Sequence, residues 1–331
     1  MEIEVQFSGG KDSQASLILA ARKYGPNNVR AIFLDTKWEK PTLYPHIRKF
    51  CKDLGVQLIE LTSKKYDGML GMVESKKRFP STKARFCTEE LKVIPFIDYL
   101  LDTVKDNVII IQGIRADESP ARAKMQEQCT FFKYYFTPHT NNFIKLQSVN
   151  STINKLHHQH KKVPISKIKE SEKYTNKLLA GEIDNKFYNY RKKDIKKHEK
   201  TFVTDVIRNV FHLTGQEVID IILEAGFTPF ENYYEGFSRV GCWPCINENL
   251  FGIYQMSIRY PERIDLIEEE EIKLGTTFFS TGKIPKRECS NGEYPTIREV
   301  VNYTHKLHAT GDLFDDKKEV GCVSHYMLCK N

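Results

Sequence analysis

The fold is decided by a short stretch near the start of the chain, Ser8-Gly9-Gly10-Lys11-Asp12-Ser13. Residues 2–7 before it are rich in aliphatic and β-branched side chains, whereas residues 12–24 after it place apolar side chains at the three- and four-residue spacing of an amphipathic helix. Two adjacent glycines allow backbone conformations closed to other residues, and they let backbone N–H groups approach an anion. The sequence therefore predicts a strand, a tight loop and a helix in direct succession.

The same alternation continues through the first 115 residues. Strand-length aliphatic runs and helical periodicity alternate at 29–34, 42–54, 57–61, 89–101 and 108–112. This β-α-β-α order predicts an α/β fold in which helices flank both faces of a parallel sheet. Because ligands of such sheets bind at the carboxyl ends of the strands, the glycine loop lies where a site is expected.

The residue types in the glycine loop predict binding of a nucleotide's phosphates. Lys11 adds a full positive charge to the partial charge of the helix N-terminus, and Ser8 and Ser13 can donate to phosphate oxygens. Asp12 is expected to hold Mg²⁺ or to cap the helix. An ordinary Gly-Gly turn with a Ser or Asp cap is the alternative, but the position between strand and helix favours the phosphate site.

A second polar segment follows the predicted strand at 108–112. Gly113, Arg115 and Glu118 come at the same sheet edge as the glycine loop, and Ser119 followed by proline predicts a capped helix start. We expect this turn to direct Arg115, Glu118 and Arg122 into the cleft, with Arg115 as the counter-charge for a leaving pyrophosphate. An exposed salt-bridge loop is the alternative.

Four cysteines predict a metal site. Cys242 and Cys245 form a C-x-x-C pair within reach of one metal, and Cys322 and Cys329 offer two further ligands. Four thiolates suit either Zn²⁺ or a [4Fe-4S] cluster, and spacing alone does not decide between them. A redox-active C-x-x-C is a third interpretation.

Cys87 has a different setting. It precedes a predicted helix and lies near Arg85 and Lys92 in the sequence, and both features lower the pKa of a thiol. We expect Cys87 to be a nucleophilic sulfur carrier or a cluster ligand, the alternative being a small buried residue. Cys289 is a possible replacement for one of the later ligands.

The composition is that of a globular protein with a core. The chain has 331 residues, of which 40% are hydrophobic, and it contains no run of the ~20 apolar residues that a membrane helix needs. The first residues lack the basic start and apolar block of a signal peptide, so we expect a cytoplasmic protein without a membrane partner. Eight cysteines in that setting predict ligands or reactive thiols rather than disulfides.

The net charge of +7 comes from one segment. Residues 140–200 hold 15 Lys or Arg against 6 Asp or Glu, a surplus of +9, while the rest of the chain holds 35 against 37, or −2. Basic clusters occupy 157–162 and 191–198, and aromatic residues accompany the second cluster. Because charge binds phosphate backbones and aromatic rings stack on bases, we expect DNA or tRNA to bind through residues 140–200. The alternative is a helical segment whose charges face solvent and keep the protein soluble.

These patterns predict three parts of the chain. Residues 1–139 are expected to form the nucleotide-binding α/β domain, and residues 140–203 a basic helical insertion in which apolar periodicity is largely lost. Helical periodicity is predicted to resume at 204–226. Residues 204–331 are then expected to form a helical, Cys-rich region that holds the metal or cluster.

The glycine loop resembles the PP-loop of the N-type ATP pyrophosphatases, which cleave ATP between its α- and β-phosphates, and it lacks the spacing of a Walker A loop. More of the chain resembles the PAPS reductase (CysH-like) family and its DndC-like branch. The segments that carry this resemblance are Asp35-Thr36, Arg85-Phe86-Cys87-Thr88 with Leu91-Lys92 and Pro95, Gly113-Ile114-Arg115 with Glu118-Ser119 and Arg122, and residues 232–245.

The resemblance implies an adenine nucleotide alpha hydrolase-like fold, with the nucleotide held by the glycine loop, by Asp35 and Thr36, and by the Gly113 segment. It implies ATP-dependent sulfur transfer to a nucleic-acid acceptor, with release of AMP and pyrophosphate and with Lys11, Cys87 and Arg115 in catalytic roles. It also implies a sulfur-donor protein as partner, and it favours a [4Fe-4S] cluster over Zn²⁺.

The sequence supports two alternative functions. In sulfonucleotide reduction, Cys87 or Cys329 would attack the sulfur of PAPS or APS and release sulfite. A single cysteine at position 87, where APS reductases have an adjacent pair, and the complete ATP-type loop favour ATP instead. The second alternative is a non-catalytic nucleic-acid-binding protein with a zinc-stabilised tail and a vestigial nucleotide site.

Overall fold

The computed structural model describes residues 1–311 of the chain. Its contacts separate two compact units, one formed by residues 129–204 and the other by the described residues before and after them. The insertion predicted at 140–203 falls within the first of these units. Among the described residues there is no helix with the length and apolar content that crossing a bilayer requires.

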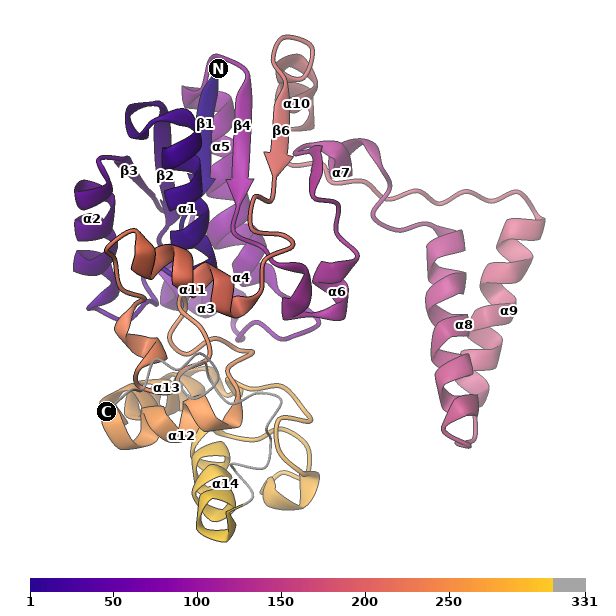
Figure 1. The fold of residues 1–331 in the computed structure, drawn as a ribbon. Helices are drawn as coiled ribbons and strands as arrows, with labels where there is room; N and C mark the ends of the chain where they lie inside the picture. Colours follow the sequence, from indigo (N-terminus) through magenta and orange to yellow (C-terminus); the bar gives the residue numbers. More distant parts are fainter. Residues whose placement is uncertain (312–331) are drawn as a thin grey trace. The chain divides into compact units, whose positions relative to one another are not determined.

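A sheet of six strands forms the centre of the fold, in the order β3-β2-β1-β4-β6-β5 (Figure 1). Strands β1 to β4 pair in parallel, which confirms the predicted α/β fold. The strands are β1 (Glu2–Gln6), β2 (Val29–Leu34), β3 (Gln57–Leu61), β4 (Val108–Gln112), β5 (Gln128–Thr130) and β6 (Thr204–Ile207). Residues 29–34, 57–61 and 108–112 have the bounds expected from the sequence.

The alternation of side chains along β1 explains why helices cover both faces of the sheet. Ile3 and Val5 belong to a core shared with the helices α1, α2 and α11. Glu4 points to the other face, where the Tyr99 hydroxyl of α5 donates to its carboxylate at 3.1 Å. Burial raises the pKa of Glu4 to about 7. One face of the sheet is therefore apolar, and the other contains a buried carboxyl group that is hydrogen-bonded to α5.

The helices follow the strands in the order that the sequence predicts. They are α1 (Lys11–Tyr24), α2 (Leu43–Leu54), α3 (Gly68–Lys76), α4 (Phe86–Thr88), α5 (Ile94–Thr103), α6 (Pro120–Ala123), α7 (Lys133–Phe136), α8 (Asn142–His158), α9 (Ile165–Leu179), α10 (Lys192–His198), α11 (Gly215–Glu224), α12 (Leu250–Arg259), α13 (Pro261–Leu274) and α14 (Ile297–Thr310). A π-helical segment, Glu89–Val93, joins α4 to α5.

The helical periodicity predicted at 204–226 is wrong in its first half. Thr204–Ile207 is strand β6, and the helix begins only at Gly215. Its start is fixed by a capping box, in which the Thr214 hydroxyl accepts the Glu217 N–H and the Glu217 carboxylate accepts the Thr214 N–H. Thr204 and Val206 are buried while Asp205 is exposed, a two-residue alternation that is typical of a strand.

A second hydrophobic cluster joins the C-terminal helices to the residues around the C-x-x-C pair. Ile253, Ile264 and Val300 contribute from α12, α13 and α14, while Trp38 and Trp243 contribute from the loops. The Trp38 indole N–H donates to the Pro244 carbonyl at 3.0 Å. This cluster fixes the position of the C-x-x-C turn beside the end of β2.

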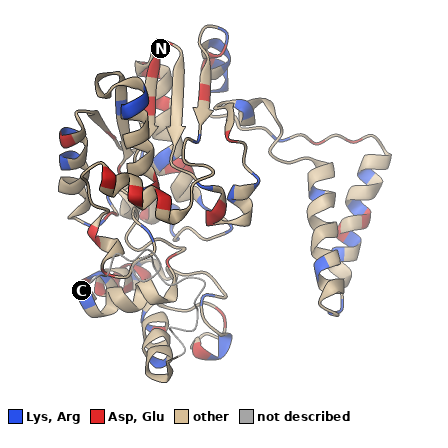
Figure 2. Ribbon diagram, viewed as in Figure 1, with Lys and Arg blue, Asp and Glu red and all other residues tan. Residues whose placement is uncertain are grey.

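The unit formed by residues 129–204 is mainly helical, and α8 packs against α9 as an antiparallel hairpin (Figure 1). The Ser171 hydroxyl of α9 donates to the Asn150 side chain of α8 at 2.7 Å. Figure 2 shows Lys and Arg without Asp or Glu along α8, whereas α9 carries both signs. The unit thus places much of the chain's basic surplus on a two-helix hairpin.

Candidate functional site

The glycine loop connects β1 to α1 and orders itself through its own serines. The Ser13 hydroxyl donates to the Gly10 carbonyl at 2.8 Å and accepts the Ser8 N–H at 3.2 Å. Gly10 stands at the N-cap of α1 in an extended conformation, and no described side chain caps the helix there. Backbone N–H groups of the first helical turn consequently face the loop, which is the arrangement that binds phosphate oxygens.

Two glycines are required by close packing around this loop. Gly9 has a φ of +76°, and a Cβ added there would lie 2.7 Å from the Leu43 Cδ1 atom. Gly113, just beyond β4, lies so close to α1 that an added Cβ would be 2.7 Å from the Asp12 carbonyl oxygen. The end of β4 therefore abuts the phosphate loop, as the predicted sheet edge requires.

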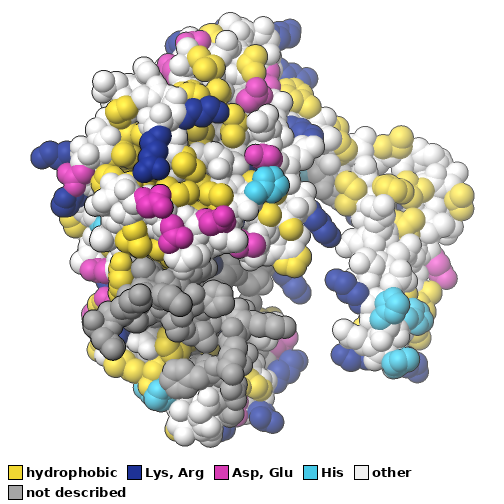
Figure 3. Space-filling model, viewed as in Figure 1, with side chains coloured by type: hydrophobic (Ala, Val, Ile, Leu, Met, Phe, Trp, Pro, Cys, Tyr) yellow, Lys and Arg dark blue, Asp and Glu magenta, His cyan; other side chains and the backbone are white. Residues whose placement is uncertain are grey.

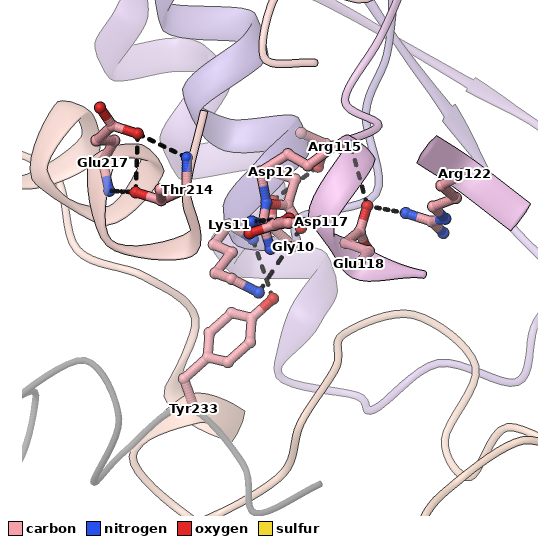
Figure 4. A network of polar contacts seen from close by, with 11 residues as sticks. Gly10, Lys11, Asp12, Arg115, Asp117, Glu118, Arg122, Thr214, Glu217 and Tyr233 are labelled. Carbon is pink, nitrogen blue, oxygen red and sulfur yellow. Dashed lines mark hydrogen bonds and ion pairs between the residues drawn. The ribbon is translucent and has the colours of Figure 1, made fainter. Parts of the chain in front are cut away.

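Lys11 is buried between the loop and an aromatic ring. Its backbone N–H donates to the Tyr233 hydroxyl at 3.1 Å, and its ammonium lies 5.1 Å from the centre of the Tyr233 ring. The same ammonium lies 3.7 Å from the Asp12 carboxylate. Figure 4 shows Tyr233 approaching the loop from a segment far along the chain. Tyr233 is a site residue that the sequence did not single out.

Arg115 is placed differently from its expected position. It is buried, its Nε donates to the Asp12 carboxylate at 2.5 Å, and its Nη1 pairs with Asp117. Burial alone would lower the pKa of Arg115, but the charge of Asp12 raises it above its ordinary value. Arg115 is absent from the lining of the cavity beside the loop, whereas Glu118 and Arg122 line it. Arg115 holds the loop through Asp12 (Figure 4).

Of the predicted pair at the end of β2, Asp35 and Thr36, only Thr36 lines the cavity. Thr36 is buried and lines the cavity, and its hydroxyl donates to the Glu39 carboxylate at 2.7 Å. The Asp35 carboxylate accepts the Lys37 N–H at 2.7 Å and the Tyr44 hydroxyl at 2.8 Å. Asp35 thus orders the turn after β2, and Thr36 faces the cavity.

A cavity of about 250 Å³ joins the phosphate loop to the cysteines. From the loop it is lined by Ser8, Gly10, Lys11, Asp12 and Ser13. From the other side it is lined by Cys87, Cys242 and Cys245, with Lys92 and Arg239 among them. Residues from five separate stretches of the sequence therefore meet at the carboxyl ends of the strands, where nucleotide sites of this fold class lie.

Two thiols of this cavity, those of Cys87 and Cys242, hold their protons more firmly than an exposed thiol does. Burial raises the pKa of Cys87, and the neighbouring Cys245 adds to the effect, while Arg85 and Lys92 lower it by less. Burial likewise raises the pKa of Cys242. The expected lowering of the Cys87 pKa is wrong because removal from water outweighs the nearby cations.

Two cations lie among these thiols. The charge of Cys242 raises the pKa of Lys92, and Glu39 acts in the same direction. For Arg239, burial lowers the pKa, but the charges of Cys245 and Glu248 more than offset it. Lys92 therefore opposes the effect of burial on the Cys87 and Cys242 thiols without outweighing it.

The cysteines do not form a complete metal site in residues 1–311. No group of three or more His, Cys, Asp or Glu in that range has the spacing to hold a metal ion. Cys242 and Cys245 line the cavity, but Cys322 and Cys329 lie outside the described residues. Cys289 is buried elsewhere and donates to the Pro285 carbonyl. The described thiols alone therefore do not fit a cluster or a zinc ion.

The chain matches known proteins over most of its length. Residues 2–248 match the family described as "Phosphoadenosine phosphosulfate reductase domain". An uncharacterised 37.8 kDa protein of Escherichia phage 186 is 26% identical over 239 residues, which cover 68% of this chain and 50% of that protein. An uncharacterised protein of Methanocaldococcus jannaschii is 29% identical over 147 residues, which cover 44% of this chain and 27% of that protein. The matched region spans half or less of these relatives.

One solved structure is similar in outline. The phosphate complex of phosphoadenylyl-sulfate (PAPS) reductase from Candida auris aligns with a TM-score of 0.41 and 12% sequence identity. The alignment covers 73% of this chain and 82% of that structure.

Proposed function

Because the chain belongs to the phosphoadenosine phosphosulfate reductase domain family, we propose that it is a PP-loop enzyme that binds ATP and cleaves it between the α- and β-phosphates. Within that family we place it beside the DndC-like proteins, as an enzyme of sulfur transfer to nucleic acid. The proposal is narrower than the family, and it depends on the cavity described above.

The observation that carries it is the joining of phosphate-binding and sulfur-bearing groups in one cavity. The loop with Lys11 forms one wall, and Cys87, Cys242 and Cys245 form the other. A nucleotide whose phosphates bind the first turn of α1 would share this cavity with the thiols. A site for nucleotide activation alone has no need of a thiol such as Cys87 in the same cavity, so the combination supports transfer of sulfur.

The residues divide the chemistry between them. An oxygen of the acceptor attacks the α-phosphorus of ATP, the bond to the bridging oxygen breaks, and pyrophosphate leaves with the electron pair. Lys11 and the N–H groups of α1 stabilise the charge that develops on the pyrophosphate, and Arg122 on the cavity wall adds a further positive charge. Sulfur at the sulfide level, delivered by a donor protein, then bonds to the activated centre while AMP leaves with the former acceptor oxygen.

The proposal includes two metal sites, one for Mg²⁺ and one formed by cysteines. Mg²⁺ would enter with the phosphates of ATP, since Asp12 already pairs with Arg115 and Lys11. We also propose a [4Fe-4S] cluster, with Zn²⁺ as the alternative, bound by Cys242 and Cys245 together with Cys322 and Cys329. No step of the reaction is assigned to it. Iron and zinc analysis of anaerobically purified protein and of Cys242→Ser tests it, because loss of bound metal from the variant is the expected result.

The test of the reaction is pyrophosphate release from MgATP by anaerobic protein, with and without DNA or tRNA. Release that nucleic acid stimulates and that Lys11→Met abolishes is the expected result. Lys23→Met is the matched control, because Lys23 is an exposed lysine in the last turn of the same helix. No release with any acceptor would contradict the proposal.

Sulfonucleotide reduction is the second candidate, because Cys87 lines the same cavity as the phosphate loop. In that reaction a thiolate would attack the sulfur of PAPS or APS, and PAP or AMP would leave as the bond from sulfur to the phosphate oxygen breaks. A second thiol would then release sulfite by forming a disulfide with the first. Sulfite formation from either sulfonucleotide, lost in Cys87→Ser, would favour this candidate over ATP cleavage.

A further inference from the structure

The segment from residue 140 to residue 169 contains no Asp or Glu. It contains six lysines and three histidines. Charge of a single sign over 30 residues repels itself, so an isolated chain gains nothing in stability from it. Such a segregated surface instead fits a partner of the opposite charge.

The hairpin concentrates this charge at its free end. The hairpin tip, residues 155–162, exposes Lys155, His157, His158, Lys161 and Lys162 to solvent. Backbone hydrogen bonds close the turn, with the Lys161 N–H donating to the Leu156 carbonyl at 2.9 Å. Figure 3 shows His and Lys side chains gathered at this end of the α8–α9 hairpin. The tip is therefore an ordered basic surface rather than a loose tail.

Three other lysines of the hairpin are already paired with carboxylates. Lys145 lies 3.0 Å from Asp184, Lys167 lies 2.6 Å from Glu170, and Lys177 lies 3.0 Å from Glu182. The three tip lysines have no acidic side chain within ion-pair distance in residues 1–311. The tip therefore offers three exposed lysines, close together in the sequence, to an external anion.

The side chains of the tip indicate which kind of polyanion it binds. It has no aromatic residue on which an unpaired base could stack, and its one large apolar side chain, Leu156, is half-buried. Ile165 and Ile168 of α9 are exposed, but two aliphatic side chains without aromatic neighbours make a poor membrane anchor. Of the aromatic residues beside the second basic cluster, Tyr188 packs against Tyr134 and His139, and the Phe187 ring lies 4.4 Å from the Lys192 ammonium.

We propose that the hairpin tip binds the phosphate backbone of a nucleic-acid duplex, without reading its sequence. The inference deepens the proposed function, because it assigns the surface through which a nucleic-acid acceptor is held. Lys155, Lys161 and Lys162 supply the phosphate contacts, and contacts to phosphate fix position rather than sequence.

The test is the salt dependence of duplex binding by the full-length protein. Each phosphate contact contributes about 0.9 to the slope of log affinity against log salt concentration. The tip variant Lys155→Gln/Lys161→Gln/Lys162→Gln is expected to reduce that slope by about 2.7. The control variant Lys145→Gln/Lys167→Gln/Lys177→Gln has the same change in net charge but replaces paired lysines. It is expected to reduce the slope much less. For the protein itself, three contacts correspond to roughly 40-fold weaker binding between 50 and 200 mM salt.

Equal effects of the two triple variants would overturn the proposal, because net charge alone would then explain binding. Tighter binding to single strands than to duplex, or binding to phosphatidylserine vesicles but not to duplex, would also overturn it. Binding of MgATP without nucleic acid, measured on the same variants by isothermal titration, keeps this outcome separate from failure of the proposed reaction. Loss of duplex binding with ATP binding unchanged is the expected pattern.

Discussion

The Tyr233 hydroxyl accepts the backbone N–H of Lys11 at 3.1 Å, across 222 positions of sequence. This N–H belongs to the first residue of α1, where a bound phosphate would place an oxygen. The centre of the Tyr233 ring also lies 5.1 Å from the Lys11 ammonium. Tyr233 thus occupies part of the phosphate site in the ligand-free protein. A bound nucleotide has to compete with this hydroxyl.

Removal of the hydroxyl in Tyr233→Phe is expected to raise the affinity for inorganic pyrophosphate about fivefold, because the Lys11 N–H loses its internal acceptor. The free energy of unfolding of the ligand-free protein should fall by about 1 kcal/mol for the same reason. Isothermal titration and urea unfolding measure the two effects. Tyr234→Phe, at a half-exposed neighbouring ring, is the control, and weaker pyrophosphate binding by Tyr233→Phe would show that the hydroxyl aids binding instead.

Gly113→Ala tests the contact between the end of β4 and the phosphate loop. The added methyl group would lie 2.7 Å from the Asp12 carbonyl oxygen and 2.8 Å from the Ser13 Cα atom, both of which are backbone. We expect ATP affinity to fall at least tenfold and stability to fall by about 1–3 kcal/mol. Gly71→Ala in α3, whose nearest neighbour is the Asp67 Cβ atom at 3.3 Å, should leave ATP binding unchanged. Normal ATP binding by Gly113→Ala would contradict the close approach.

Arg115 and Arg122 are predicted to have separable roles. Arg115→Ala leaves the Asp12 carboxylate without its buried partner, so we expect a loss of about 3 kcal/mol of stability. Arg122→Ala removes a half-exposed side chain from the cavity wall, so stability should change by less than about 0.5 kcal/mol while pyrophosphate release slows. Thermal unfolding and steady-state rates distinguish the two. A fully stable Arg115→Ala protein with only a reduced kcat would place Arg115 on the pyrophosphate instead.

Glu271 predicts a pH dependence of stability. Its carboxylate accepts the Phe278 and Ile297 N–H groups, yet burial raises its pKa to about 7. Between about pH 4.5 and 7 the folded protein therefore binds more protons at Glu271 than the unfolded chain, and stability from this group falls as pH rises through that window. Glu271→Gln keeps an acceptor but cannot ionise, so its urea midpoint should depend less steeply on pH. Identical pH profiles of the two proteins would contradict the assignment.

The sequence predicted the sheet well because its strands are dense in β-branched and aliphatic residues. The helix start at Gly215 was missed although Thr214 and Glu217 have the spacing of a capping box, a signal that outweighs the apolar residues before it. The strand β6 was missed because its four residues are too short for a two-residue period to stand out.

The site was predictable where a motif is local and not where it depends on tertiary contact. The glycine loop and Thr36 line the cavity at the sheet edge where their sequence positions suggested a site, and the C-x-x-C pair, predicted only as part of a metal site, lines the same cavity. Tyr233 contacts Lys11 although 222 positions separate them in the sequence, and Arg115 is absent from the cavity wall because its guanidinium pairs with Asp12. The spacing of residues in the sequence predicts neither of these two contacts.

The most direct test of the central claim is the fate of labelled ATP. Protein is incubated anaerobically with Mg²⁺, duplex DNA or tRNA, and ATP labelled at the α- or the γ-phosphorus. The account predicts that the α label appears in AMP or an adenylated acceptor, that the γ label appears in pyrophosphate, and that Lys11→Met abolishes both. Release of the γ label as inorganic phosphate with ADP, or no turnover with any acceptor, would contradict it.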